Sequence, residues 1–207
     1  AVEQPGDFSG LPPAIIVDVD ETVLDNSAYQ ARLVASGGEF EPATWNAWVD
    51  ERKATAIPGA VEFLGAAAKK GVRVFYVSNR DAAQAEATRD NLARLGFPDS
   101  DDLETLYFRD AAKGWKDKSP RRAEVAKTHR VILVFGDNLF DFEEKDKATL
   151  GERDAIVDQR AAWWGSRWFI LANPMYGSWD DALFQYDRAK TAAEKQQLRQ
   201  GALDPAR

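Results

Sequence analysis

The chain is built around the stretch Ala14-Ile15-Ile16-Val17-Asp18-Val19-Asp20-Glu21-Thr22-Val23-Leu24-Asp25-Asn26, in which a run of β-branched residues ends abruptly in two carboxylates. Residues 14–19 are predicted to form a buried strand. Side chains at i and i+2 of a strand point to the same face, so Asp18 and Asp20 should converge where the strand leaves the sheet. Two like charges that close repel each other unless a cation or a shared proton holds them. The pair therefore predicts a divalent metal site, with one carboxylate as nucleophile and the other as proton donor.

Two other interpretations of this pair stay open on the stretch alone. Acidic residues also follow a strand where the chain simply reaches solvent, and a nucleotide-sugar transferase uses such a pair to hold a metal. An EF-hand loop is excluded, because Val23 stands where that loop needs glycine and Tyr29 where it needs glutamate. The rest of the chain has to separate the remaining interpretations.

The composition narrows the chemistry. The chain has 207 residues, enough for one domain, and its net charge of -7 argues against a general nucleic-acid binder. No apolar run is long enough to span a bilayer and no signal peptide is visible, although Ala1 is compatible with the start of a mature or trimmed chain. With no cysteine and one histidine, thiolate nucleophiles, paired histidines and multi-histidine zinc sites are excluded. Hydrolytic chemistry would have to use carboxylates, hydroxyls, lysine and a hard metal ion.

Strand and helix patterns alternate along the chain, which predicts an α/β fold with a parallel sheet between helices. After a polar lead-in over residues 1–13, strands are predicted at 14–19, 72–77, 103–108, 131–135 and 168–171. Helices are predicted at 58–71, 82–95 with Asp81 as cap, from Ser119-Pro120 onward, and at 179–199. The chain is thus expected to be a single catalytic domain, residues 1–207, with its core at about 14–26 and 58–199. Residues 27–57, helical in pattern and rich in aromatics, are expected to form a cap.

Polar clusters fall at the ends of three predicted strands. They are Asp18 with Asp20, Ser78 with Asn79 and Arg80, and Asp137 with Asn138 and Asp141. In open parallel sheets, ligands bind beyond the carboxyl ends of the strands. The coincidence at three strands therefore predicts one site built from all of them.

These residue types suit phosphoryl transfer, in which catalysis is mainly positioning and electrostatic stabilisation. A hard cation fits Asp18, the main-chain oxygen near Asp20, and Asp137, with positions left for phosphate and water. Ser78 and the amides after its strand can donate to phosphate oxygens. Lys118 stands before a predicted helix start, where anions are favoured.

The motifs resemble those of the haloacid dehalogenase superfamily and, within it, the class C nonspecific acid phosphatases of bacteria. The two signatures are Ile16-Val17-Asp18-Val19-Asp20-Glu21-Thr22-Val23-Leu24-Asp25-Asn26-Ser27-Ala28-Tyr29 and Ile132-Leu133-Val134-Phe135-Gly136-Asp137-Asn138-Leu139-Phe140-Asp141-Phe142. Shorter matches are Val77-Ser78-Asn79-Arg80, Lys116-Asp117-Lys118-Ser119, Trp45-x-x-Trp48-Val49 and Asn173-Pro174-Met175-Tyr176-Gly177. The resemblance covers roughly residues 14–180 and implies a Rossmann-like parallel sheet flanked by helices, with a small helical cap. Val19 departs from the signature, where Ile or Leu is expected; this changes packing and not chemistry.

The resemblance also implies a role for each site residue. Asp18 would be the nucleophile that forms an aspartyl-phosphate, and Asp20 the acid and then the base. Phosphate would be held by Ser78, Asn79, Arg80 and Lys118; Mg2+ would be held by Asp18, Asp20 and Asp137, with Asp141 supporting the site directly or through water. Lys113 and Lys116 are alternatives for the lysine, and Lys118 is preferred for its place at the helix start.

The substrates implied by the resemblance are 5'-nucleotides and aryl phosphates. Phe40, Trp45 and Tyr176 are candidates to stack on a base or aryl ring, or else they pack within the cap. The expected partner is a small phosphomonoester such as a nucleoside monophosphate, not a nucleic acid. The family also implies a periplasmic or outer-membrane location, although this chain shows neither a leader nor a cysteine for a lipid anchor.

Other polar and aromatic residues are given structural interpretations. His129 is expected at the surface, and Arg121 and Arg122 on an exposed helix face, although one of them could reach the aspartates. Trp163, Trp164 and Trp168 are expected to pack rather than to bind a ligand.

Three rival functions are weighed against phosphatase activity. A receiver domain also accepts phosphate on aspartate, but Asp20 and the insertion of about thirty residues after the first strand oppose it. A non-catalytic phosphate-ester binding protein is opposed by the complete set of catalytic positions. A phosphotransferase or mutase with the same aspartyl-phosphate stays open.

Overall fold

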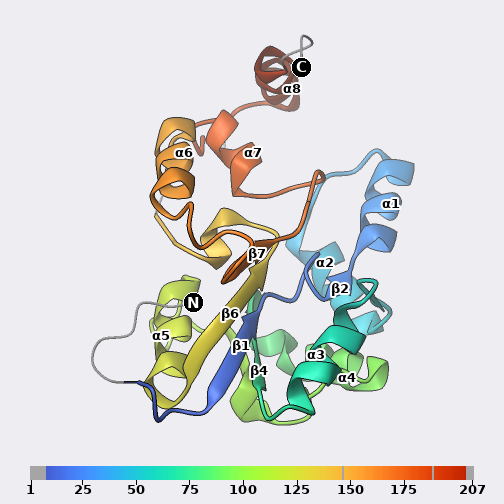
Figure 1. The fold of residues 1–207 in the computed structure, drawn as a ribbon. Coiled ribbons are helices and arrows are strands. Elements are labelled where there is room, and N and C mark those ends of the chain that lie inside the picture. Colours follow the sequence, from blue (N-terminus) through green and yellow to red (C-terminus); the bar gives the residue numbers. More distant parts are fainter. Residues whose placement is uncertain (1–7, 146, 188, 204–207) are drawn as a thin grey trace.

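The computed structural model describes residues 8–145, 147–187 and 189–203. Its main sheet, within these residues, has five parallel strands in the order β5-β4-β1-β6-β7 (Figure 1). The strands are β1 (Pro13–Val17), β4 (Arg73–Asp81), β5 (Leu106–Arg109), β6 (Arg130–Gly136) and β7 (Trp168–Ile170). The α/β prediction is therefore confirmed, and β1, which carries the opening stretch, lies at the centre of the sheet.

Helices cover both faces of this sheet (Figure 1). The α-helices are α1 (Ser27–Ser36), α2 (Pro42–Glu51), α3 (Ala60–Ala68), α4 (Ala85–Leu95), α5 (Lys118–Thr128), α6 (Leu150–Gln159), α7 (Ser178–Leu183) and α8 (Ala192–Ala202). Short 3-10 helices are η1 (Ala82–Gln84), η2 (Leu103–Thr105) and η3 (Leu139–Asp141), and β2 (Leu24–Asp25) pairs with β3 (Thr55–Ala56). Residues 27–57, the predicted cap, thus contain α1, α2 and β3.

The alternation of side chains along β1 divides the core into two clusters. Ile15 and Val17 pack with residues of α3 and α4, including Leu64. Ile16 packs on the other face, where Val125 of α5 contributes to the second cluster. Because all of these side chains are buried on one face or the other, β1 is held firmly from both sides and its carboxyl end is fixed in space.

Two predicted boundaries are wrong. The helix predicted at 179–199 is two helices, α7 and α8, separated by residues 184–191; residue 188 lies outside the described residues. The strand predicted at 103–108 begins only at Leu106, after the 3-10 turn η2. The predicted lead-in lies partly outside the described residues, since residues 1–7 are not among them.

The start of α5 also differs from the prediction. Asp117, and not Ser119, is the capping residue, because its side chain accepts a hydrogen bond from the Ser119 amide at 2.9 Å. The helix therefore begins at Lys118 itself. This places the lysine in the first turn of the helix, one residue after the cap.

Candidate active site

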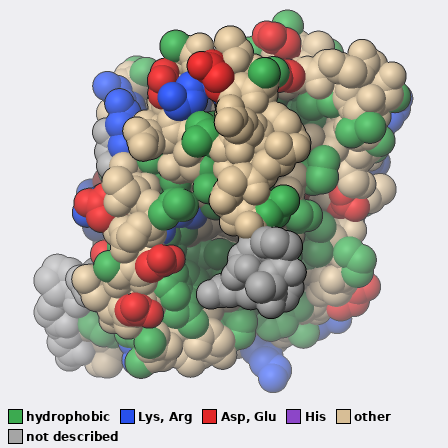
Figure 2. All heavy atoms as spheres, turned by 90° about the horizontal axis from the view of Figure 1, so that it is seen from above, with side chains coloured by type: hydrophobic (Ala, Val, Ile, Leu, Met, Phe, Trp, Pro, Cys, Tyr) green, Lys and Arg blue, Asp and Glu red, His purple; other side chains and the backbone are tan. Residues whose placement is uncertain are grey.

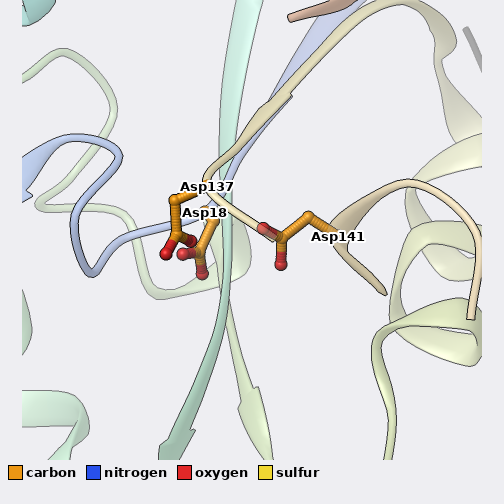
Figure 3. A group of neighbouring side chains, drawn as sticks. All are labelled: Asp18, Asp137 and Asp141. Carbon is orange, nitrogen blue, oxygen red and sulfur yellow. The ribbon is translucent and has the colours of Figure 1, made fainter. Parts of the chain in front are cut away.

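Three carboxylates meet at the carboxyl edge of the sheet (Figure 3). Asp18 follows β1, Asp137 follows β6, and Asp141 ends η3. One oxygen from each lies within 4.8 Å of the others. The Asp18 amide donates to the Phe135 carbonyl at 3.0 Å, so the pairing of β1 with β6 continues up to the cluster and brings its residues together.

Asp141 is held by the turn that follows β6. Its Oδ2 accepts a hydrogen bond from the Asn138 amide at 2.8 Å, and the side chain of Asn138 caps the same short helix. A Cβ on Gly136 would overlap the Asp141 side chain and lie 2.6 Å from its Cγ. Glycine at position 136 is therefore needed for Asp141 to fold back against the end of β6.

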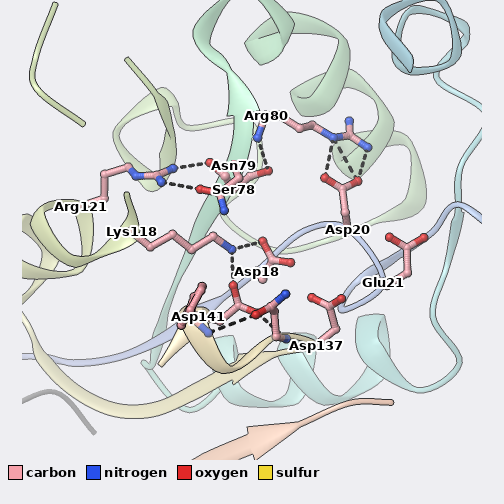
Figure 4. Close-up of polar contacts among 12 residues, drawn as sticks. Asp18, Asp20, Glu21, Ser78, Asn79, Arg80, Lys118, Arg121, Asp137 and Asp141 are labelled. Atoms are coloured by element: carbon pink, nitrogen blue, oxygen red, sulfur yellow. Dashed lines mark hydrogen bonds and ion pairs between the residues drawn. The ribbon is translucent and has the colours of Figure 1, made fainter. Parts of the chain in front are cut away.

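Lys118 lies between two members of the cluster (Figure 4). Its Nζ donates to Asp18 Oδ1 and, at 2.6 Å, to Asp141 Oδ1, and the side chain is buried. Burial alone lowers the pKa of Lys118, but the two carboxylates outweigh it and the net shift is upward. The lysine therefore stays charged and brings one positive charge to the site. Lys113 lies over Trp115 instead, and Lys116 is exposed.

The aspartate cluster carries more negative charge than Lys118 neutralises. Burial, and then the neighbouring carboxylates, raise the pKa of Asp18 well above its ordinary value despite the opposing effect of Lys118. Burial and Asp141 raise the pKa of Asp137 to about 7. Crowded carboxylate oxygens are the ligands that hard divalent cations prefer, and a cation would relieve this repulsion. The donor set therefore fits a divalent metal ion.

Asp20 lies outside this cluster, with its side chain directed towards Arg80 (Figure 4). Its carboxylate accepts hydrogen bonds from Arg80 Nε and Nη2, the latter at 2.7 Å, and from Asn26 Nδ2 at 2.9 Å. Arg80 is in turn bonded to Thr88 at 2.9 Å and lies over the Trp45 ring at 5.5 Å. Arg80, predicted to bind phosphate, is thus paired with Asp20, and only the main-chain oxygen of Asp20 remains as a candidate metal ligand.

Ser78 and Asn79, the other predicted phosphate-binding residues, lie at the end of β4 and are fixed by Arg121. The Arg121 guanidinium donates to the Ser78 carbonyl and, at 2.7 Å, to Asn79 Oδ1. Its Nε donates to the Asp117 carbonyl at 2.9 Å. Arg121 therefore joins the end of β4 to the start of α5, where Lys118 lies.

The prediction that Arg121 and Arg122 lie on an exposed helix face is wrong. Arg121 is 0% exposed and Arg122 is 6% exposed. Arg122 donates to the Asp141 carbonyl at 2.9 Å and to Ser119 Oγ at the same distance. Both arginines face the edge of the sheet, because main-chain carbonyls there need hydrogen-bond donors. The spacing of residues along a helix does not reveal this requirement.

The three aromatic candidates lie in different surroundings. Phe40 is 59% exposed and its ring lies 6.3 Å from that of Trp45, which also contacts Tyr29 edge-on at 5.2 Å. The half-buried Tyr176 donates its hydroxyl hydrogen bond to Glu21. Burial and Asp20 raise the pKa of Glu21 to about 8.

Asn173 is a site residue that the sequence interpretation quoted only as part of a motif. Its Nδ2 donates to Asp137 Oδ2 at 2.7 Å. The segment that follows β7 therefore reaches the aspartate cluster. The sequence feature that could have identified Asn173 is its position shortly after a predicted strand of the same sheet.

The remaining candidates pack against aromatic rings. His129 is half-buried, with its ring 4.8 Å from Phe75, and burial lowers its pKa. Trp168 is buried and packs edge-on against Trp163 at 4.9 Å and Trp164 at 5.2 Å, as predicted. A cavity of about 590 Å³ lies beside them, lined by residues of α6, β7 and α7 together with Asp137 and Asn138.

On the face in Figure 2, acidic and basic side chains are interspersed with uncharged ones, and hydrophobic side chains reach the surface at several places. None of the helices in the described ranges is both long enough and apolar enough to span a membrane.

Comparisons with known proteins find acid phosphatases that match most of the chain. The family model for acid phosphatases of haloacid dehalogenase (HAD) superfamily subfamily IIIB matches residues 3–179. The class C acid phosphatase from Bacillus anthracis is 40% identical, with a TM-score of 0.87, over 94% of this chain and 80% of that one. A second crystal structure of that enzyme has tungstate bound.

Two plant proteins are more distant relatives. Acid phosphatase 1 of Solanum lycopersicum is 30% identical over 163 residues, and the stem 31 kDa glycoprotein of Glycine max is 26% identical over 166 residues. Each alignment covers 78% of this chain. This chain spans 57% of the tomato protein and 58% of the soybean protein.

Proposed function

The chain belongs to the acid phosphatase family, subfamily IIIB of the HAD superfamily, and we propose that it is a Mg2+-dependent phosphomonoesterase. The observation that carries the proposal is the cluster of Asp18, Asp137 and Asp141 at one edge of the sheet, with Lys118 in its midst. Asp18 is the proposed nucleophile. The substrate is a small phosphate ester, and the intermediate is an aspartyl-phosphate.

The proposed metal ligands are carboxylates of Asp18 and Asp137 and the main-chain oxygen of Asp20, with Asp141 supporting them. A bound Mg2+ would neutralise charge on the phosphate and on the attacking carboxylate. Asp141 has a second function in this scheme, because it shares Lys118 with Asp18. The lysine thus orients the nucleophile while its remaining donor capacity is available to a phosphate oxygen.

Two displacements at phosphorus complete the reaction. In the first, an Asp18 oxygen forms a bond to phosphorus, the bond from phosphorus to the ester oxygen breaks, and Asp20 gives its proton to the departing alcohol. In the second, water attacks phosphorus, Asp20 accepts its proton, and the bond to Asp18 breaks to release inorganic phosphate. The acid role requires the Asp20 side chain to turn from Arg80 towards the leaving group.

Ser78 and Asn79 are the proposed partners of the phosphate oxygens. Both lie at the end of β4, the strand beside β1, and Arg121 fixes them relative to Lys118. Donors held in place before the reaction stabilise charge that develops in the transition state without having to reorganise. Arg121 is therefore a positioning residue in this proposal.

We propose aryl phosphates and nucleoside monophosphates as the substrate class. The support is the group of rings on the cap side: Phe40 and Trp45 form a pair, and Arg80 links Trp45 to Asp20, the proposed proton donor. Tyr176 is the third ring proposed to contact the leaving group. A location outside the cytoplasm is likewise part of the proposal and rests on the family alone.

Replacing Trp45 or Tyr176 by Ala tests the substrate class. We expect KM to rise for a nucleoside monophosphate more than for a small alkyl phosphate, since stacking on one base contributes about 1–3 kcal/mol in single-strand binders. Steady-state kinetics with both substrates measure the difference. Equal effects on the two would contradict stacking.

The test of the function itself is hydrolysis of p-nitrophenyl phosphate and of a nucleoside monophosphate, with and without Mg2+, by wild type and Asp18→Asn. We expect Mg2+-dependent phosphate release by wild type and a loss on the order of 10³-fold or more in the variant. Binding without turnover would instead identify a phosphate-ester binding protein. Transfer to an added alcohol in place of hydrolysis would identify a phosphotransferase.

A further inference from the structure

The segment between β7 and α7, residues 171–177, carries two side chains that reach the active site from the same loop. Asn173 donates from Nδ2 to Asp137 Oδ2 at 2.7 Å. A carboxylate with one oxygen held by an amide has its plane fixed, so the second oxygen is presented in a defined direction.

The other end of the same amide shapes the loop. Asn173 Oδ1 accepts hydrogen bonds from the main-chain amides of Met175 at 3.0 Å and Tyr176 at 3.4 Å. This is an Asx turn, in which an asparagine side chain replaces a main-chain acceptor. Both ends of one side chain are thus in use, one on Asp137 and one on the turn that carries Tyr176.

Tyr176 is joined in turn to the loop that carries the nucleophile. Its hydroxyl donates to Glu21 Oε2, and Glu21 Oε1 accepts from the Asn26 amide at 3.1 Å. Glu21 has a φ of 56°, uncommon for a residue other than glycine, so this loop has a specific shape to preserve. The contacts therefore run without a break from Asp137 through Asn173 and Tyr176 to Glu21.

Resting on the proposed function, we propose that Asn173 is a positioning residue that couples two parts of the site. Through Nδ2 it orients Asp137 towards the metal ion, and through Oδ1 it places Tyr176 beside the substrate. Residues that orient metal ligands typically change metal affinity by 10–100-fold when they are replaced. A residue that only supported the loop would leave metal affinity unchanged.

The experiment measures Mn2+ binding to the full, substrate-free chain by electron paramagnetic resonance of free Mn2+. Asn173→Leu keeps the size of the side chain and removes both its donor and its acceptor. We expect its Kd for Mn2+ to rise by about 10–100-fold. Tyr176→Phe, the matched control, removes only the hydroxyl contact with Glu21, and we expect its Kd to stay near the wild-type value.

A second variant separates the two ends of the amide. In Asn173→Ser the hydroxyl can still accept from the turn, as serine does more weakly than asparagine, but it is too short to reach Asp137 in the same way. We expect the same weakening of Mn2+ binding with a smaller rise in KM for p-nitrophenyl phosphate than in Asn173→Leu. This variant also carries the test if Asn173→Leu does not fold, as judged by thermal unfolding.

The outcomes distinguish this inference from the function on which it rests. If wild type neither binds Mn2+ nor releases phosphate, the proposed function fails. If wild type does both and the Asn173 variants keep the wild-type Kd, the positioning role of Asn173 is overturned. The same conclusion follows if Tyr176→Phe weakens Mn2+ binding as much as Asn173→Leu does.

Discussion

At the scale of single residues, Gly136 shows how closely the end of β6 is packed. A Cβ at this position would overlap the side chain of Asp141, which shares Lys118 with Asp18. Asp141 has little freedom to move aside, because its Oδ2 is bonded to the Asn138 amide and its Oδ1 to Lys118. The need for glycine at this position is therefore steric, and it arises from the active site itself.

We expect Gly136→Ala to displace Asp141 and to lower kcat at least tenfold, an order of magnitude typical of a misplaced site group. Steady-state hydrolysis of p-nitrophenyl phosphate measures the loss. Gly65→Ala is the matched control, because nothing lies within 4 Å of a Cβ at this position in α3. It should keep full activity and gain about 0.5–1 kcal/mol of stability, since alanine favours helix over glycine. Wild-type kcat in Gly136→Ala would contradict this account.

The charged residues of the site differ in how far sequence could predict their surroundings. The strand and helix patterns were enough to bring together Asp18, Asp137 and Lys118. The two aspartates each follow a predicted strand, and the lysine begins a helix whose position was also predicted. The pairing of Asp20 with Arg80 was not predictable, since their contact crosses 60 positions and depends on a side-chain rotamer. The burial of Arg121 was missed for a similar reason: its partners are main-chain carbonyls, which no residue pattern marks.

At the scale of elements, the first turn of α5 determines where Lys118 lies. Asp117 caps the helix through the Ser119 amide, and the Arg121 guanidinium bonds the Asp117 carbonyl. The cap is therefore both a helix start and a support for the charged side chain in the next position. A capped first turn has the same geometry in any helix, but the first turn of α5 lies beside the proposed nucleophile, Asp18.

Replacing Asp117 by Ala should cost about 1 kcal/mol of stability, the usual effect of losing a helix cap, and should also reduce kcat. Chemical denaturation and kinetics measure the two effects. Thr191→Ala removes the equivalent cap from α8, a helix with no buried residue among those described, so it should affect stability and leave kcat unchanged. If both variants lowered kcat equally, α5 would have no special role in placing Lys118.

Element boundaries were predictable where hydrophobic runs or glycine marked them. The runs at β1, β4 and β6 were found because buried parallel strands are apolar on both faces. The break between α7 and α8 was missed, because no glycine or proline marks it. The chain turns there at Gln185 and Tyr186, which adopt φ values of 56° and 58° despite being neither glycine nor asparagine.

At the scale of the whole molecule, an acidic chain concentrates its functional charge at one edge of a sheet. The net charge is -7, yet the site buries Lys118, Arg121 and Arg80 among its aspartates. The strand order and the comparisons with known proteins confirm the α/β architecture and the resemblance to class C acid phosphatases that the motifs indicated. The division into core and cap and the individual residue roles stay predictions, because they depend on how substrate and metal bind.

The excess carboxylate charge predicts a pH-dependent response to Mg2+. Without metal, the pKa of Asp137 is raised to about 7, and the pKa of Asp18 is raised too. At pH values between the ordinary and the raised pKa of these groups, the folded chain therefore binds more protons than the unfolded chain. Stability of the metal-free protein should therefore fall as pH rises through this window. Because Mg2+ competes with these protons, it should raise Tm more at about pH 8 than at about pH 5.

Thermal unfolding with Mg2+ and with a chelator, at both pH values, measures this effect. Asp137→Asn is the matched variant, since it removes one of the crowded carboxylates. Its metal-free form should lose less stability with rising pH than wild type does. A Mg2+-induced rise in Tm that was equal at both pH values would contradict the charge-crowding explanation.

Trapping the covalent intermediate shows whether the Asp18 carboxylate attacks phosphorus. Wild-type protein with Mg2+ is mixed with p-nitrophenyl phosphate, quenched in acid within the first turnover, digested and mapped by mass spectrometry. We expect one phosphoryl group on the peptide that contains Asp18, and none in Asp18→Asn treated in the same way. Rapid phosphate release with no phosphorylated peptide, or with the label on another residue, would contradict attack by Asp18.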